Sequence, residues 1–322
     1  MEKYTLDKLD RKILSELELN SRQSYPKIAK KCRTSKEVVN YRVKNLVKNG
    51  VIIRFFTEIN LAKFGLQIYK IYFQFQNLTE EKEKEMYSYF TQELGIPWVI
   101  SCSGKYDMII SFGAKDVHHF DEYLTRIMDK FSEYILNKEV SATSFFITYN
   151  RKWINNSHII KKTTVGGKLE QPSIDELDYK ILAYLSDNSR IHIIDLATNV
   201  NLTSGAVIER IKKMERNGII NAYRIGLDYK KLGKEFCKSF IYLKSKTSEK
   251  EKKLIAYIEQ LPEIFTVIKS VGSWDIEFEF IVDNFHEFHS IMKILREKFD
   301  FIRNYESVII SKEYGINYFH FI

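Results

Sequence analysis

Apolar residues in the first part of the chain recur with helical spacing. Leu9, Ile13, Leu14 and Leu17 fall at positions i, i+4, i+5 and i+8, so they form one stripe of an amphipathic helix. A second short helix is expected from about residue 24 and a third from Ser35, because serine is a favoured N-cap residue. Three short helices with a tight turn between the last two predict a helix-turn-helix domain.

The third helix and the segment after it complete this unit. Val39, Val43 and Leu46 would form its buried face, and Gly50 would end it because glycine readily adopts the left-handed conformation of a C-terminal cap. Residues 51–59 are rich in β-forming types and predict a short wing. The domain is therefore expected to be a winged helix-turn-helix.

Beyond residue 70 the hydrophobic period changes to alternation. Ile71, Phe73 and Phe75 alternate with more polar neighbours, which predicts a strand. The elements expected after it are a helix over 79–94, strands over 98–103 and 108–112, a helix over 116–131 and a strand over 140–149. This βαββαβ order predicts a ferredoxin-like domain with both helices on one face of its sheet. The other face carries Tyr72 and requires a partner.

The chain contains this organisation twice. Residues 9–65 match residues 177–233 at a constant offset of 168 without a gap, and 18 of the 57 positions are identical. The same offset carries Gly104-Lys105-Tyr106-Asp107 onto Gly272-Ser273-Trp274-Asp275. A repeat of this length indicates duplicated domains. The second copy places Phe240 and Tyr242 on the matching sheet face, so each copy is the expected partner of the other.

The predicted fold class is α+β, with two copies of a winged helix-turn-helix followed by a ferredoxin-like domain. The helix-turn-helix domains are expected over 1–65 and 173–233, and the ferredoxin-like domains over 66–150 and 234–322. Residues 151–172 are polar, weakly patterned and rich in turn formers, so they predict a solvated linker.

One set of residues carries a family resemblance: Leu9-Asp10, Ile13-Leu14, Arg22, Ala29, Ser35, Val39, Arg42-Val43, Leu46, Asn49-Gly50-Val51-Ile52, Gly65 and the turn Gly104-Lys105-Tyr106-Asp107. In this order they resemble the Lrp/AsnC family of transcription regulators, and the resemblance covers nearly the whole chain twice. The family implies a winged helix-turn-helix and a ligand-sensing RAM domain in each unit, with pairing through the sensing domains. The tandem chain resembles such a dimer joined into one polypeptide. Further homo-oligomerisation stays open.

The net charge of +8 is confined to one part of the chain. Residues 1–65 hold 15 basic and 7 acidic residues, whereas 66–169, 170–233 and 234–322 carry net charges of +1, 0 and −1. A basic surface on one small domain is the electrostatic signature of phosphate binding. Double-stranded DNA is therefore the expected partner, and the first copy is the expected main reader.

The third helix supplies the candidate DNA-binding side chains. With its apolar stripe inward, steps of 100° per residue turn its polar residues outward. The candidates are Ser35, Lys36, Glu37, Asn40, Tyr41, Arg42, Lys44 and Lys48, with Arg54 in the wing. Arg42 lies beside the apolar stripe, so it is expected to contact the DNA backbone or to brace the domain. In the second copy Gly205, Ile208 and Glu209 replace three of these residues, which predicts weaker binding or a structural role.

The turn Gly-x-aromatic-Asp joins two central strands in each ferredoxin-like domain. The residues alone favour a structural role, in which glycine relieves the turn and aspartate caps backbone amides. The family resemblance implies an effector pocket at this turn, usually for an amino acid, at the interface of the sensing domains. The implied effector-binding residues are Gly104, Tyr106, Asp107, Gly272, Trp274 and Asp275. Because the two turns differ, two non-equivalent pockets or one working pocket are expected.

Two other functions stay open at this point. Siroheme decarboxylases share the tandem architecture, but that family places a histidine- and arginine-bearing segment around the central hairpin. Residues 101–107 contain neither residue type, and the chain has no P-loop, dinucleotide-binding glycine pattern or G-x-S-x-G elbow, so no enzymatic activity is expected. An architectural protein without an effector is the third possibility.

Cysteine and histidine spacing predicts no metal site and no cofactor. Cys32, Cys102 and Cys237 are far apart and odd in number, which is typical of buried thiols in a reducing cytoplasm. The seven histidines show no metal-ligand spacing. No apolar stretch approaches the roughly 20 residues of a membrane helix, and residues 1–20 hold no signal-peptide block. A cytoplasmic location without membrane partners is expected.

Overall fold

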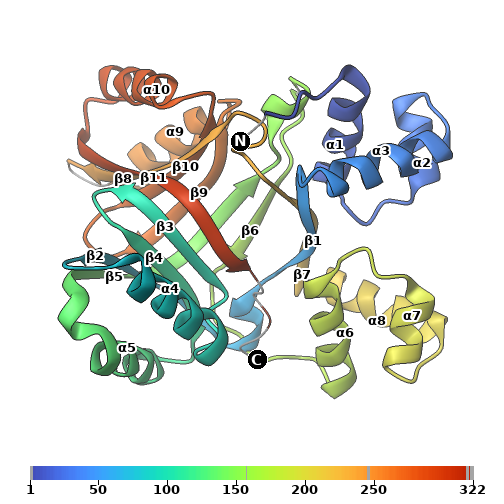
Figure 1. Cartoon of the computed structure of the whole chain (residues 1–322), viewed down its shortest axis with the longest axis horizontal. Helices are drawn as coiled ribbons and strands as arrows, with labels where there is room; N and C mark the ends of the chain where they lie inside the picture. Colours follow the sequence, from blue (N-terminus) through green and yellow to red (C-terminus); the bar gives the residue numbers. More distant parts are fainter. Residues whose placement is uncertain (1–2, 157, 245–246, 317–318, 320–322) are drawn as a thin grey trace.

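The computed structural model describes residues 3–156, 158–244, 247–316 and 319. Two helix-turn-helix units lie on one side of the molecule, and a barrel of strands with helices on its outside forms the other side (Figure 1). This arrangement confirms the predicted α+β class with two copies of each unit.

The first helix-turn-helix unit has the three predicted helices. These are α1 (Lys8–Leu19), α2 (Tyr25–Cys32) and α3 (Lys36–Lys48). Ser35 is the N-cap of α3, and its hydroxyl accepts a hydrogen bond from the Val38 amide. Val39, Val43 and Leu46 are buried on the inner face of α3, as predicted.

The second unit repeats this pattern. Its helices are α6 (Glu176–Asp187), α7 (Ile193–Asn199) and α8 (Ser204–Arg216). In both units an aspartate, Asp7 or Asp175, closes a capping box with the aspartate three residues later at the start of the first helix. The two units are therefore built by the same local rules, as expected of a duplication.

The expected wing takes a different form. Strand β1 (Ile52–Ile59) and strand β7 (Ile220–Leu227) pair with each other antiparallel, with Phe55 opposite Ile225. The strand predicted over residues 51–59 is present, and its partner is the equivalent strand of the other copy. Each strand is followed directly by the segment that enters the barrel. The backbone groups along its open edge require partners, and the strand of the other copy provides them. The β1–β7 ribbon thus joins the two helix-turn-helix units.

The ferredoxin-like halves follow the predicted order of elements. The first consists of β2 (Gln67–Phe75), α4 (Glu80–Ser88), a π-helical turn (Tyr89–Glu93), β3 (Trp98–Gly104), β4 (Met108–Ala114), α5 (Val117–Phe131) and β5 (Ile135–Tyr149). The second consists of β8 (Glu235–Leu243), α9 (Ser248–Ile258), β9 (Ile264–Val271), β10 (Ile276–Val282), α10 (Phe285–Lys298) and β11 (Ile302–Ile316). Helices α4 and α5 pack on one face of the first sheet, and α9 and α10 on that of the second.

The two halves share one continuous sheet. Its strand order is β2-β4-β3-β11-β8-β10-β9-β5, and β5 also pairs with β2, so the sheet closes into a barrel. The joins between the copies are β3–β11 and β5–β9. The ring of Tyr72 lies inside, 5.6 Å from that of Phe240, which confirms that each copy covers the other's open sheet face.

The segment between the copies is part of the fold. Residues Lys152–Ile154 form a buried turn of 3₁₀ helix, and β6 (Lys162–Gly166) pairs with β5. Arg151 is buried and forms an ion pair with Glu18 in α1. The expectation of a solvated linker over 151–172 is therefore wrong for these residues, because a buried charge pair and strand pairing hold them in place.

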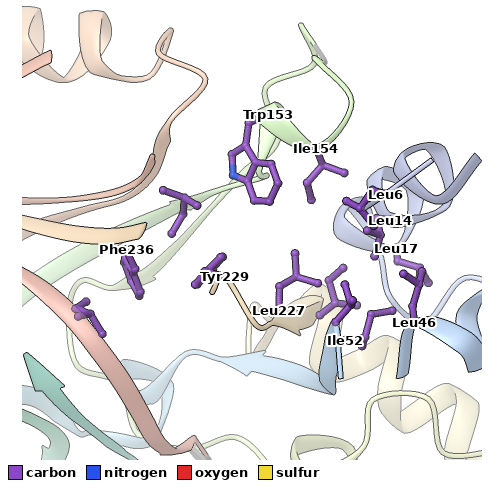
Figure 2. Packing of buried hydrophobic residues seen from close by; sticks show 14 of the residues in the cluster. Leu6, Leu14, Leu17, Leu46, Ile52, Trp153, Ile154, Leu227, Tyr229 and Phe236 are labelled. Carbon is purple, nitrogen blue, oxygen red and sulfur yellow. The ribbon is translucent and has the colours of Figure 1, made fainter. Parts of the chain in front are cut away.

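The core of the first helix-turn-helix unit continues into the barrel. Leu14 and Leu46 belong to the same buried cluster as Trp153, Tyr229 and Phe236 (Figure 2). Packing of this kind transmits strain because protein interiors have low compressibility.

Among the described helices, none is long and apolar enough to cross a membrane.

Candidate nucleic-acid interface and sensing core

The outer face of α3 presents most of the predicted DNA-binding side chains to solvent. Lys36, Glu37, Lys44 and Lys48 are exposed, and Tyr41 is 68% exposed. Within the described residues none of the three lysines takes part in an ion pair. Free ammonium groups around an exposed aromatic ring provide both phosphate contacts and a group that reaches base edges.

Ser35, Glu37 and Asn40 have more local roles. The pKa of Glu37 is lowered by hydrogen bonds from its own backbone amide and from the Ser35 hydroxyl, so its carboxylate caps the start of α3. Negative charge is favourable at that end of a helix. Asn40 is partly buried at the side of the exposed face. These three residues lie beside the lysines and Tyr41, as predicted.

Arg42 serves as the internal brace. Its Nη1 lies 2.5 Å from an oxygen of Asp7 and 3.3 Å from one of Asp10, so it ties α3 to the start of α1. Arg210 makes the same two contacts in the second copy, with Asp175 and Asp178. Because both copies hold their third helix in this way, the contact positions the helix. The positive charge of the arginine is paired with aspartates of the same unit.

Arg54 does not lie on the DNA-facing side. Its guanidinium lies 4.6 Å from the centroid of the Phe56 ring, on the face of β1 that lines an internal cavity, whereas the neighbouring Ile53 is 52% exposed. Successive side chains of a strand point to opposite faces, so residues 54, 56 and 58 all turn inward together. The structure therefore places Arg54 apart from the exposed residues of α3, and its contact with DNA stays a prediction.

The second recognition helix, α8, has a different surface. Gly205, Ile208 and Glu209 are exposed where α3 carries Glu37, Asn40 and Tyr41. Glu209 forms an ion pair of 2.9 Å with Lys212, which takes up part of the positive charge of this helix. The face of α8 is thus poorer in both free cations and base-reading groups than that of α3.

The turn aspartates and glycines join strands. Asp107 accepts a hydrogen bond of 2.8 Å from the Phe75 amide, and Asp275 accepts one of 2.7 Å from the Leu243 amide. Gly104 has a φ of +132°, and a Cβ there would lie only 2.5 Å from the Ser307 carbonyl oxygen. These contacts match the structural role that the residues alone favoured.

The two turn aromatics meet inside the barrel. The rings of Tyr106 and Trp274 have centroids 6.2 Å apart, and they are 1% and 2% exposed. The Tyr106 hydroxyl donates to Glu139 at 2.7 Å, and the Trp274 ring nitrogen donates to Glu277 at 3.3 Å. The structure thus brings the two predicted turns together and fills the space between them with their own side chains.

A buried charge cluster beside these rings was missed in the sequence. Lys70 and Lys238, which occupy equivalent positions, both contact Glu277, at 3.0 and 2.7 Å, and Lys238 also contacts Glu279 at 2.7 Å. Burial lowers the pKa of Lys70 to about 8. Burial opposes ionisation of Glu277, but Lys238 and Lys70 outweigh it and hold its pKa well below the usual range. The sequence feature that could have indicated this cluster is the pair of lysines, which lie at equivalent positions of the repeat within otherwise apolar strands.

The remaining chemistry is sparse. Cys32, Cys102 and Cys237 are buried free thiols, and burial raises the pKa of Cys102 and of Cys237 to about 12. Thiols with such pKa values are unreactive. In the part of the chain that the structure describes, no group of three His, Cys, Asp or Glu residues could hold a metal ion.

Comparison with known proteins adds the family. A model of winged helix-turn-helix DNA-binding domains matches residues 6–53 and 174–221. The regulatory protein AsnC of Haemophilus influenzae is 28% identical over 137 residues, which cover 42% of this chain and 91% of AsnC. An HTH-type transcriptional regulator of Pyrococcus furiosus is 32% identical over 135 residues, which cover 41% of this chain and 85% of that protein. The chain belongs to the Lrp/AsnC family.

As a member of the Lrp/AsnC family, the protein is a DNA-binding transcriptional regulator. It differs from the two relatives above in carrying two units in one chain. The structure of the siroheme decarboxylase NirDL superposes on 97% of this chain and covers 94% of its own, with a TM-score of 0.63 and 9% sequence identity. At that identity the likeness concerns the fold alone, over nearly the whole of both chains.

Proposed function

We propose that this regulator reads duplex DNA asymmetrically, with α3 as the main recognition helix and α8 as a weaker contact. The observation that carries the proposal is the exposed face of α3. There Lys36, Lys44 and Lys48 surround Tyr41 without ion-pair partners among the described residues, in the domain that holds the whole charge excess. Lysine ammonium groups bind phosphates and release counterions, which provides most of the affinity of such proteins.

Two matched sets of charge reversals test this asymmetry. The first variant changes Lys36, Lys44 and Lys48 to glutamate, and the second changes Lys212, Lys213 and Arg216 to glutamate. Both alter the formal charge equally, so a difference reports which helix binds. We expect the first variant to lose at least about 100-fold in affinity and the second less than about 10-fold, measured by fluorescence anisotropy at fixed salt. Equal losses would contradict the proposal.

The DNA for this measurement is obtained by selecting bound sites from random duplexes at physiological salt. One dominant reader predicts an asymmetric motif, whereas two equal readers predict a palindrome. A palindromic motif together with equal losses in the two variants would show that both copies read DNA in the same way.

An enzymatic alternative rests on the full-length fold shared with a siroheme decarboxylase. One published structure of that enzyme is a complex with an iron-uroporphyrin III analogue. The residues around the first turn of this chain include neither histidine nor arginine, and the rings of Tyr106 and Trp274 occupy the space between the turns. We therefore propose a regulator without catalytic activity. Mixing the protein with iron uroporphyrin should leave the porphyrin absorption spectrum unchanged, and a shifted band would favour the enzyme.

We further propose that the regulator responds to a small effector. Binding at the two turns, as the family resemblance implies for Gly104, Tyr106, Asp107, Gly272, Trp274 and Asp275, would require the buried rings of Tyr106 and Trp274 to move aside. Both aspartates would also have to release a backbone amide. Effector binding at the turns therefore requires both the rings and the aspartate contacts to rearrange.

A further inference from the structure

A pocket of about 210 Å³ lies where three parts of the chain meet. Residues 3–6 and Arg11 line it from the start of the chain, and Trp153 lines it from the segment between the copies. Leu232 and Lys234, in the connection between β7 and β8, complete the wall. A water molecule takes up about 30 Å³ in the liquid, so the pocket has room for about seven waters or for one small organic molecule.

The charged side chains that line the pocket are all basic. They are Lys3, Arg11 and Lys234. Lys234 forms an ion pair of 2.6 Å with Asp283, which does not line the pocket. Arg11 donates to the carbonyl oxygen of Ile154 at 3.2 Å, and among the described residues neither Arg11 nor Lys3 forms an ion pair. Two cations without a carboxylate partner therefore line a pocket that has no acidic residue in its wall.

A buried hydrogen-bond donor lies beside these cations. Trp153 is 9% exposed, and its ring nitrogen is buried without a hydrogen-bond partner among the described residues. The ammonium of Lys234 lies 4.9 Å from the centroid of the Trp153 ring, so the donor and the basic groups are close together. Buried polar groups in proteins are almost always hydrogen-bonded. A donor of this kind next to basic side chains suits an anionic acceptor.

The equivalent place in the second copy is filled by aromatic rings. Three of the lining residues have apolar or aromatic equivalents at the repeat offset of 168: Tyr179 for Arg11, Phe64 for Leu232 and Leu66 for Lys234. The ring centroids of Phe64 and Tyr179 lie 5.8 Å apart, and both lie 6.0 Å from that of Phe319. Side-chain packing thus closes one of the two equivalent places, whereas shorter and basic side chains line a pocket in the other.

The chemistry of the wall selects among small anions. A phosphate monoester carries a charge of about −1.5 to −2 at neutral pH and has three acceptor oxygens, so it matches two cations and an N–H group. Leu6 and Leu232 add an apolar surface, against which a short alkyl group is buried favourably. The ammonium of an amino acid would meet only basic side chains here. A phosphodiester of DNA carries a single charge and is continued by the chain on both sides.

We propose that this pocket binds a small phosphate monoester. Lys3, Arg11 and the ring nitrogen of Trp153 hold its phosphate group. The alkyl part of the ligand lies against Leu6 and Leu232. None of the lining residues belongs to α3 or to the two turns, so the site is distinct from the proposed DNA-binding face and from the proposed effector contacts.

The pocket lies next to contacts that hold the recognition helix. The Tyr4 amide donates to the Lys231 carbonyl oxygen at 2.7 Å, and the Lys231 ammonium donates to the carbonyl oxygen of Asn49, the C-cap of α3, at 2.5 Å. A ligand in the pocket would contact the start of the chain, the segment between the copies and the β7–β8 connection together. It would therefore stabilise the packing of the first helix-turn-helix unit against the barrel.

The test is calorimetric titration of the full chain with propyl phosphate at neutral pH and fixed ionic strength. We expect one binding site per chain and a higher melting temperature, because a ligand that binds the native state stabilises it. Butyrate has the same alkyl group and a single negative charge, and it should bind at least about 10-fold more weakly. Inorganic phosphate lacks the alkyl group and should bind more weakly than propyl phosphate.

Variants of the wall locate the site. Arg11→Gln and Trp153→Phe should each weaken propyl phosphate binding at least about 10-fold, and Lys3→Gln, at an exposed side chain outside the core, at least about 5-fold. Arg11→Tyr combined with Lys234→Leu introduces the residues of the second copy and should abolish binding. Lys27→Gln makes the same change of charge as Arg11→Gln on the exposed face of α2 and should stay within about twofold of the wild type.

The proposal is overturned if propyl phosphate does not bind, or if the variants at Arg11, Trp153 and Lys3 bind it as the wild type does. Titration of duplex DNA with the same variants distinguishes the other source of phosphate. If Arg11→Gln weakens DNA binding while the wild type does not bind propyl phosphate, the basic groups serve the DNA backbone and the proposal is wrong. Melting temperatures without ligand report whether each variant is folded.

Discussion

The hydroxyl oxygens of Ser21 and Ser189 lie 2.9 Å apart, and the two serines occupy equivalent positions in the two copies. The pseudo-twofold axis thus passes between the helix-turn-helix units at a direct contact. Beside it Arg22 donates to the carbonyl oxygens of Ser189 and Ile191, and Arg190 donates to those of Ser21 and Gln23. This exchange fixes the two recognition helices relative to each other.

Removing one arginine of this exchange should destabilise the chain. Arg22→Ala or Arg190→Ala leaves carbonyl oxygens at the contact without charged donors, which costs about 1–3 kcal/mol of the free energy of unfolding. Chemical denaturation measures this loss. Lys27→Ala, on the exposed face of α2, is the control and should stay within about 0.5 kcal/mol of the wild type. Arginine variants as stable as the control would show that the exchange contributes nothing.

The buried charge cluster predicts a second loss. Glu277→Gln leaves Lys70 without its ion-pair partner and removes one of the two carboxylates that contact Lys238. We therefore expect the free energy of unfolding at neutral pH to fall by about 3–5 kcal/mol. The double variant Glu277→Gln with Lys70→Met removes the unpaired ammonium as well and should recover part of the loss. If the double variant is no more stable than the single one, the unpaired lysine is not the cause.

The lowered pKa of Lys70, about 8, predicts a specific pH dependence. Between this value and about 10.5, the ordinary value, the unfolded chain keeps a proton that the folded chain has released. Stability therefore increases with pH across this window, by up to about 1.4 kcal/mol per pH unit for one proton. Denaturation curves between pH 7 and 10 should show this contribution in the wild type and not in Lys70→Met. Parallel curves for the two proteins would contradict the assignment.

Substitution of glycine by alanine should have opposite effects on stability at two positions. Gly104 has a positive φ and lies against the Ser307 carbonyl, so Gly104→Ala forces β3 and β11 apart and should cost about 2 kcal/mol or more. Gly205 lies within α8 with open space around it, so Gly205→Ala should stabilise the chain by about 0.5 kcal/mol. Melting temperatures that move in the same direction for both variants would refute this contrast.

Tyr41 and Lys44 should affect DNA binding in different ways. Lys44→Gln removes one phosphate contact, so the slope of log affinity against log salt should decrease by about one. Tyr41→Ala removes an exposed neutral group, so we expect about 10-fold weaker specific binding with an unchanged slope. A reduced slope for Tyr41→Ala would mean that the ring acts only by placing a neighbouring lysine.

Local patterns were enough to predict most elements of this protein. The apolar stripe of α3, its Ser35 cap and the alternation in β2 follow from contacts within a few residues, so they are readable in the sequence. Internal repetition and the family resemblance then led to the tandem architecture and to a DNA-binding regulator. The exposed lysines of α3 follow from the same helical spacing.

Only the tertiary structure decided how the two copies join. Whether β1 forms its own wing or pairs with β7, and whether the sheets stack or close into a barrel through β3–β11 and β5–β9, depends on backbone partners far away in the chain. The inward turn of Arg54, the folded segment at Arg151 and the pairing of Lys70 with Glu277 follow from that closure. Periodicity reports which side of an element is buried, but not which distant element, or which charge, it is buried against.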